Sequence, residues 1–128
     1  MEFIKLTLSP YGSYSYKDAS NIAMNILGNF FSSDVGCSDQ SRPSYRDWAL
    51  DDSWGMCVSG NITCLEKAGN YIFLTDQYSE ESQPTELKIS RHKFVQLLDD
   101  WQKKVCKHKP REVTIIYDGT QFTIETRG

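Results

Sequence analysis

Residues 86–126 constrain the fold most, because successive stretches fit a strand, a helix and a hairpin. A short alternating stretch leads to Ser90, whose side chain can cap the helix that follows, expected over about 91–106. The predicted buried stripe of this helix is Phe94, Leu97, Leu98, Trp101 and Val105. Alternating apolar residues around an Asp-Gly pair then predict a hairpin over 112–126 with a type I′ turn.

The N-terminal part predicts a strand and a second amphipathic helix. Alternating apolar residues favour a strand over about 2–8. Ser15 and Asp18 have the spacing of a capping box, so the helix is expected over about 17–31. Its predicted buried face is Ala19, Ile22, Ala23, Ile26, Leu27, Phe30 and Phe31.

The middle of the chain predicts a β-meander over 53–89. Gly60-Asn61 and Gly69-Asn70 are two-residue turn signals, which place strands near 53–59, 62–68 and 71–78. The first turn would set Cys57 opposite Cys64, and the second would set Leu65 opposite Leu74. The face expected under the helices is Trp54, Met56, Val58, Leu65, Ile72 and Leu74. Residues 32–51 show no periodicity and are expected to form a long irregular excursion, and 79–85 a polar loop.

These elements predict one α+β domain spanning residues 1–128. The meander 53–89 and the hairpin 112–126 would form one antiparallel sheet, packed against helices at about 17–31 and 91–106. The N-terminus has no basic stretch followed by a long apolar one, and no apolar run reaches membrane-spanning length. We therefore expect a cytoplasmic protein.

The four cysteines lack Cys-x-x-Cys spacing, which argues against a zinc ribbon or a redox motif. In a reducing cytosol the expected state is four free thiols. A disulfide between Cys57 and Cys64 is the alternative, since the predicted register makes them neighbours.

Charge is segregated along the chain. Residues 71–87 hold four acids and no Lys or Arg, and residues 32–65 hold five acids against two arginines. Residues 88–111 hold eight Lys or Arg against two acids. Each charged run can simply be a solvated face. Alternatively, the acidic loop surface can bind a basic partner, or the basic helix can contact phosphate.

The sequence offers no recognisable catalytic, cofactor or metal site. The predicted helix separates His92 from His108 by roughly 24 Å, so they cannot share one metal or one triad. Gly-x-Ser-x-Gly, His-Glu-x-x-His and phosphate-binding Gly-rich motifs are absent. Asp51 and Asp52 are adjacent, and strand neighbours point to opposite faces, which makes them a poor catalytic pair. A non-enzymatic protein without cofactor is therefore expected.

Three stretches carry a resemblance to a known family. They are Asn70–Ser79 (NYIFLTDQYS), Pro84–Ser90 (PTELKIS) and Phe94–Gln102 (FVQLLDDWQ). Within about the last 60 residues, the chain resembles the immunity proteins of bacterial contact-dependent growth inhibition systems, a class of polymorphic-toxin immunity proteins. The resemblance implies a small cytosolic inhibitor that binds the C-terminal toxin domain of its partner and covers the active site. Many such toxins are nucleases, whose clefts are basic because their substrate is anionic.

Acids and aromatic residues in the irregular segments are the candidate contacts with such a basic partner, since aromatic residues dominate interface hot spots. The predicted partner-binding residues are Tyr45, Asp47, Trp48, Asp51, Asp52, Asp76, Tyr78, Glu80 and Glu81. The basic helix is expected to be a structural bystander. The alternative function is a small adaptor or regulatory module that binds another protein.

Overall fold

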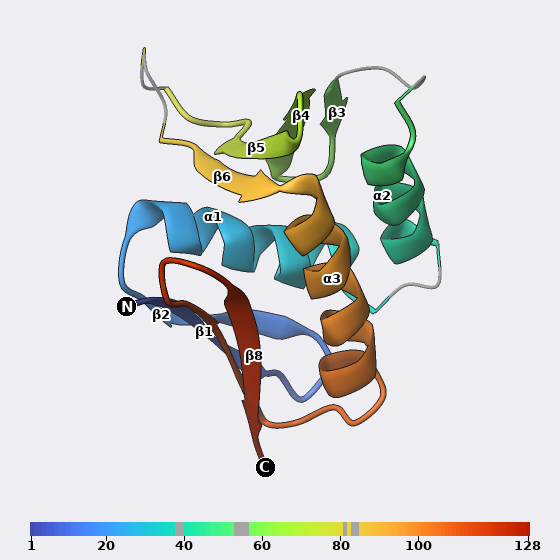
Figure 1. Ribbon diagram of the computed structural model, residues 1–128. Helices are drawn as coiled ribbons and strands as arrows, with labels where there is room; N and C mark the ends of the chain where they lie inside the picture. The colour runs from blue at the N-terminus through green and yellow to red at the C-terminus, as the bar shows by residue number, and fades with distance from the viewer. Residues whose placement is uncertain (38–39, 53–56, 81, 83–84) are drawn as a thin grey trace.

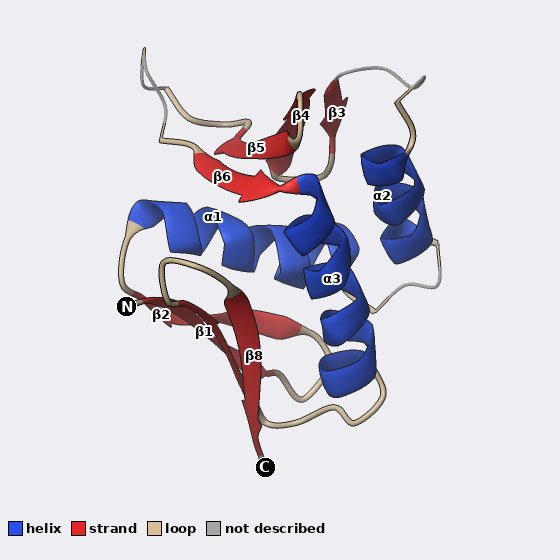
Figure 2. Ribbon diagram, in the orientation of Figure 1, coloured by secondary structure: helices blue, strands red, loops and turns tan. Residues whose placement is uncertain are grey.

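The computed structural model describes residues 1–37, 40–52, 57–80, 82 and 85–128 and has the α+β class that the sequence predicts. Two four-stranded antiparallel sheets enclose a layer of helices, with α1 and α3 between them and α2 at one side (Figures 1 and 2). In chain order the elements are β1 (Glu2–Leu8), β2 (Tyr14–Ala19), α1 (Ile22–Asn29), η1 (Phe30–Val35), α2 (Ser41–Leu50), β3 (Cys57–Ser59), β4 (Thr63–Ala68), β5 (Tyr71–Asp76), β6 (Leu87–Ser90), α3 (Arg91–Trp101), η2 (Gln102–Cys106), β7 (Glu112–Tyr117) and β8 (Phe122–Arg127).

The meander and the C-terminal hairpin belong to different sheets, so the predicted single sheet is wrong. One sheet has the order β2-β1-β7-β8 and the other β3-β4-β5-β6. The N-terminal strand β1 lies between β2 and β7, with Ile4 opposite Ile115. This pairing joins segments more than 100 residues apart, which local turn signals cannot reveal.

The first helix begins later than predicted. Tyr14–Ala19 forms β2, an edge strand whose first residue, Tyr14, is buried. Asn21 then caps α1, because its side-chain oxygen accepts a hydrogen bond from the Met24 N–H at 2.9 Å. The capping box at Ser15 and Asp18 is therefore wrong. The π-helical turn η1 extends this helix to Val35.

Close packing fixes α1 on the first sheet. A Cβ atom at Gly28 would lie only 2.5 Å from Cγ1 of Ile4 on β1, so only glycine permits this approach.

The expected excursion at 32–51 contains a helix, α2, between residues 41 and 50. Tyr45, Trp48 and Ala49 follow the i, i+3, i+4 spacing of a buried helical face, and Pro43 lies in the first turn, where proline is tolerated. The other positions are mostly polar, so this three-residue pattern was too short to indicate a helix in the sequence.

One of the two meander turns is confirmed. Ala68 pairs with Tyr71 around Gly69-Asn70, which sets Leu65 opposite Leu74 as predicted. The described part of the first strand is Cys57–Ser59, so the predictions for Trp54 and Met56 lie outside the described residues.

The other meander turn is longer than predicted. Ser59 pairs with Cys64, and Val58 therefore faces Leu65, two residues away from the predicted partner. The buried carboxylate of Asp34 causes the wider turn, since it accepts the N–H groups of Ile62 and Thr63 at 2.9 Å each. A shift of two residues leaves every side chain on its predicted face.

The helix predicted over about 91–106 is confirmed. Ser90 caps α3 by accepting the Lys93 N–H at 3.2 Å, and the π-helical turn η2 continues the helix to Cys106. The whole predicted stripe is buried: Phe94, Leu97, Leu98, Trp101 and Val105. In the part of the chain that the structure describes, no helix is long and apolar enough to cross a membrane.

The C-terminal hairpin is confirmed, but its turn is not type I′. Tyr117 pairs with Phe122, which leaves four residues in the loop instead of two. Asp118 stabilises this loop because its Oδ1 accepts the N–H groups of Thr120 at 2.8 Å and Gln121 at 2.9 Å.

A disulfide joins Cys37 to Cys106, with 5.4 Å between the Cα atoms, so the prediction of four free thiols is wrong. Cys57 and Cys64 are free, and Cys57 lies opposite Glu66. The pairing depends on two helix ends 69 residues apart in the chain, which no spacing rule identifies.

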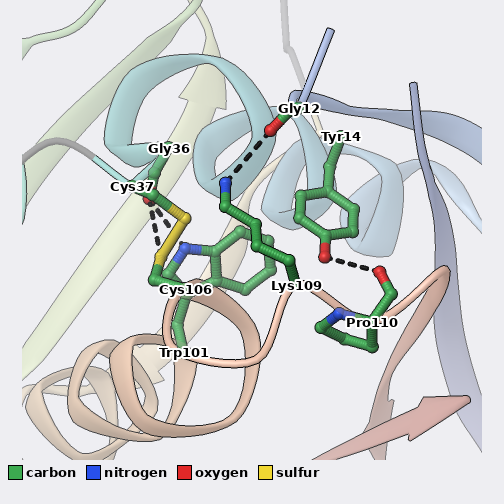
Figure 3. Close-up of a disulfide and its surroundings, with 8 residues drawn as sticks. All are labelled: Gly12, Tyr14, Gly36, Cys37, Trp101, Cys106, Lys109 and Pro110. Atoms are coloured by element: carbon green, nitrogen blue, oxygen red, sulfur yellow. Dashed lines mark hydrogen bonds between the residues drawn. A yellow bond between two sulfur atoms is a disulfide. The ribbon is translucent and has the colours of Figure 1, made fainter. Parts of the chain in front are cut away.

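Hydrogen bonds surround this disulfide (Figure 3). The Trp101 indole N–H donates to the Gly36 carbonyl at 2.8 Å, and the Tyr14 hydroxyl donates to the Pro110 carbonyl at 2.6 Å. Lys109 Nζ donates to the Gly12 carbonyl at 3.0 Å. The disulfide and these bonds, which we call the Trp101 clamp, tie the ends of η1 and η2 to the β1–β2 hairpin.

Candidate protein-binding surface

The nine predicted contact residues fall into two separate groups. Five lie on or just after α2: Tyr45, Asp47, Trp48, Asp51 and Asp52. Asp76, Tyr78 and Glu80 lie at the end of β5 and after it, and Glu81 lies outside the described residues. Residues 77–80, which follow β5, lie on the side of the molecule away from α2 (Figure 1). The two groups therefore do not form one continuous surface.

The aromatic residues of α2 belong mainly to the core. Trp48 is only 2% exposed, and the ammonium of the buried Lys67 lies 4.8 Å from the centre of its ring. Lys67 also donates to the carbonyl oxygens of Trp48 and Asp51 at 2.7 and 2.6 Å, which holds the C-terminal end of α2 against β4. Trp48 therefore anchors the fold and is not on the surface.

Tyr45 is half-buried, and its ring packs edge-to-face on Phe30 with 4.9 Å between centroids. Burial raises the pKa of the Tyr45 phenol, and the nearby charge of Asp34 raises it further. Among the α2 acids, Asp47 is exposed and Asp52 forms an ion pair with Arg91 at 2.6 Å. This group thus offers a partner few unused side chains.

The group after β5 presents an exposed aromatic residue on an ordered turn. Tyr78 is 71% exposed, and its N–H donates to Asp76 Oδ1 at 2.9 Å. Between them, the Gln77 side-chain amide donates to the carbonyl oxygens of Gly60 and Asn61 at 2.9 and 2.6 Å. These bonds fix the start of the loop, so Tyr78 is held in place without being buried.

Helix α1 extends this surface, which the sequence did not predict. Ile22, the first residue of α1, is 60% exposed although it was expected to be in the core. A cavity of about 150 Å³ lies between α1 and the segment after β5, lined by Ile22, Asn25, Ile26, Asn29, Asp76, Ser79 and Thr85. Within the described chain, no hydrogen bond engages the side-chain amides of Asn25 and Asn29. We give the name α1–β5 surface to Ile22, Asn25, Asn29 and Asp76 at this cavity together with the exposed Tyr78 and Glu80 of the segment that follows β5.

The α1–β5 surface draws on two stretches of chain without positive charge. Neither residues 20–35 nor residues 71–87 contain a Lys or Arg. Asp76, Glu80 and Glu86 supply negative charge, whereas Asp34 is buried. A surface that combines acids, free amides and exposed apolar groups has the chemistry of a protein interface with a basic partner. The signal available in the sequence was the spacing of Ile22, Asn25 and Asn29 at i, i+3 and i+7.

The histidines do not suggest a reaction centre. His92 and His108 are exposed near the two ends of the α3–η2 helix, and neither forms a hydrogen bond or ion pair within the described chain. Among the described residues, no group of three His, Cys, Asp or Glu side chains is placed to hold a metal ion.

Comparison with known proteins adds no assignment. No family model matches the chain, and neither a curated protein nor a solved structure is similar to it. The function must therefore be argued from the surface itself.

Proposed function

We propose that this protein is the cytosolic immunity protein of a contact-dependent growth inhibition system. In this proposal, the α1–β5 surface binds a basic toxin domain, a nuclease in the simplest case, and covers its active site. The observation that carries the proposal is an exposed aromatic side chain, Tyr78, held on a turn within a stretch of sequence, 71–87, that contains no Lys or Arg.

Electrostatics support a basic partner. A nuclease cleft is positively charged because it holds a polyanion, so a negatively charged protein surface is attracted to it and can occupy it. Complementary charge of this kind mainly accelerates association and selects the partner. The first resembling stretch, 70–79, contains Asp76 and Tyr78 and thus coincides with this surface.

Apolar contacts would supply most of the affinity. Large side chains that are exposed in the free protein and become desolvated in the complex typically dominate binding energy. Tyr78 and Ile22 have this character, at 71% and 60% exposure. The stripe of α3 faces the core, so this helix is left to support the fold.

The test measures binding to the toxin domain encoded by the reading frame directly upstream, and protection of cells that express it. One variant combines Asp76→Asn, Glu80→Gln and Glu86→Gln, and its counterpart combines Lys103→Gln, Lys104→Gln and Lys107→Gln. Circular dichroism first establishes that both are folded. We expect the acid variant to associate more slowly and to lose most of its salt dependence, with the lysine variant unchanged.

The reverse result would refute the proposal. If the lysine variant abolished protection while the acid variant still bound with full salt dependence, the basic helix would be the interface. If a housekeeping gene lay upstream and no toxin domain bound, the adaptor function would be favoured.

A further inference from the structure

A second pocket lies where the edges of the two sheets approach each other beside the start of α3. Tyr71 and Lys88 come from β5 and β6, Tyr117 and Phe122 from β7 and β8, and Lys93 from the first turn of α3. The cavity has a volume of about 380 Å³. Small-molecule sites commonly have volumes of about 300–1,000 Å³, so a ligand of moderate size fits here.

Aromatic rings form the walls of this pocket. Tyr117 and Phe122 are cross-strand neighbours that stack with their centroids 4.5 Å apart and their planes at 23°. They continue the inward face of the sheet beyond the buried pair Ile115 and Ile124, and both remain partly exposed. Across the cavity, Tyr71 is 43% exposed. Partly exposed aromatic side chains of this kind can stack on a planar ring.

Two lysines line the same pocket, and neither forms an ion pair in the described chain. Lys88 Nζ lies 4.1 Å from the centre of the Tyr71 ring and forms no ion pair in the described chain. Lys93 Nζ donates to the Thr120 carbonyl, a neutral group. The neighbouring acid, Asp118, accepts two N–H groups of the turn at its Oδ1; these bonds, and to a smaller extent the charge of Lys93, lower its pKa. By contrast, Lys17, Arg42, Arg46 and Arg91 form ion pairs with acids.

We propose that this pocket binds a nucleoside monophosphate. The base would stack on the Tyr117–Phe122 pair, and Lys88 and Lys93 would hold the phosphate. Stacking is tolerant of base identity because every base has a π-face, and a lysine ammonium is a compact charge suited to phosphate. This pocket is formed by residues other than those of the α1–β5 surface, so the inference is independent of the proposed immunity function.

The experiment titrates the full chain with AMP by calorimetry and by NMR, and repeats the titration with adenosine and with inorganic phosphate. We expect AMP to bind more tightly than either, because only AMP uses both the rings and the lysines. Lys88→Ala should weaken AMP binding by about tenfold, the loss of one charge-assisted contact. Lys103→Ala, which removes an exposed lysine further along the same helix, should leave the affinity unchanged.

The rings need their own control. Tyr117→Leu should abolish the preference of AMP over phosphate, whereas Tyr117→Phe keeps the stack and should bind AMP like the wild type. Circular dichroism identifies any variant that fails to fold. If the Tyr117 variant is unfolded, the result for Lys88→Ala, a change at an exposed side chain, decides the test. Three results would overturn the inference. They are equal affinity for AMP and phosphate, an equal loss of AMP affinity in Lys88→Ala and Lys103→Ala, and no AMP binding at all.

Discussion

The Trp101 clamp and the α1–β5 surface use similar residue types in opposite ways. In the clamp, the polar groups of Tyr14, Trp101 and Lys109 all donate to backbone carbonyls, and a disulfide lies among them. On the α1–β5 surface, Tyr78 is exposed and the amides of Asn25 and Asn29 are unbonded within the described chain. The clamp is built to hold the ends of the chain's helices together. The other region keeps its groups available to a partner.

The difference predicts that changes in the clamp affect folding and changes on the surface affect binding. Trp101→Ala should have the largest effect. It leaves a cavity beside the buried rings of Tyr14 and Phe31 and removes the indole hydrogen bond, so we expect a loss of about 3–5 kcal/mol in the free energy of unfolding. Urea denaturation followed by circular dichroism measures it. Trp101→Phe, which keeps most of the ring volume, should lose clearly less, and a loss below about 1 kcal/mol in Trp101→Ala would contradict the central role of the clamp.

The disulfide should contribute nearly as much. Closing a loop of this size in the unfolded chain corresponds to about 4 kcal/mol, so reduction or Cys37→Ser with Cys106→Ser should lower stability by about that amount. Thiol titration of the unfolded protein should count two groups before reduction and four after it. Cys57→Ser with Cys64→Ser is the matched control and should change stability little.

The stability of the reduced protein also tests the proposed cytosolic location. A reducing cytosol keeps thiols free, so a cytosolic immunity protein must remain folded with Cys37 and Cys106 reduced. If the reduced protein is unfolded at 37 °C, the cytosolic proposal fails, whatever surface binds the partner.

The two regions also differ in how much of them could be predicted from the sequence. Helix α3 was predictable because its cap at Ser90 and its buried stripe are local and periodic. The Cys37–Cys106 bond and the pairing of β1 with β7 were not, because they join residues brought together only by the completed fold. The sequence placed Tyr78 at the end of the predicted strand 71–78, next to the polar loop, and named it as a contact residue, and Tyr78 is exposed. The exposed position of Ile22 could not be predicted, because helical periodicity identifies an apolar face but does not show which of its residues the rest of the fold covers.

On the surface side, Tyr78→Ala should change stability by less than about 0.5 kcal/mol, as substitutions at exposed sites usually do. Its effect on binding should be at least about 2 kcal/mol, if it is the hot spot of the interface. Tyr11→Ala is the matched control, since Tyr11 is 95% exposed on the β1–β2 hairpin beside the clamp. Calorimetry with the toxin domain compares the two variants. Equal losses would mean that the α1–β5 surface has no special role.

The smallest effect concerns the turn between β7 and β8, which lies outside both regions. Hydrogen bonds from the backbone N–H groups of Gln121 and Thr120 lower the pKa of the Asp118 carboxyl below its ordinary value of 3.8. Because the folded-state pKa is the lower one, ionised Asp118 stabilises the fold fully above the unfolded-state pKa. This contribution disappears as pH falls through the folded-state pKa. Wild-type protein should therefore unfold at a higher temperature than Asp118→Ala at pH 6, and the gap should narrow towards pH 2. Asp118→Asn keeps an acceptor oxygen without the charge, so it should retain part of the stability at pH 6. A gap between wild type and Asp118→Ala that is the same at both pH values would show that the carboxylate charge contributes nothing to this turn.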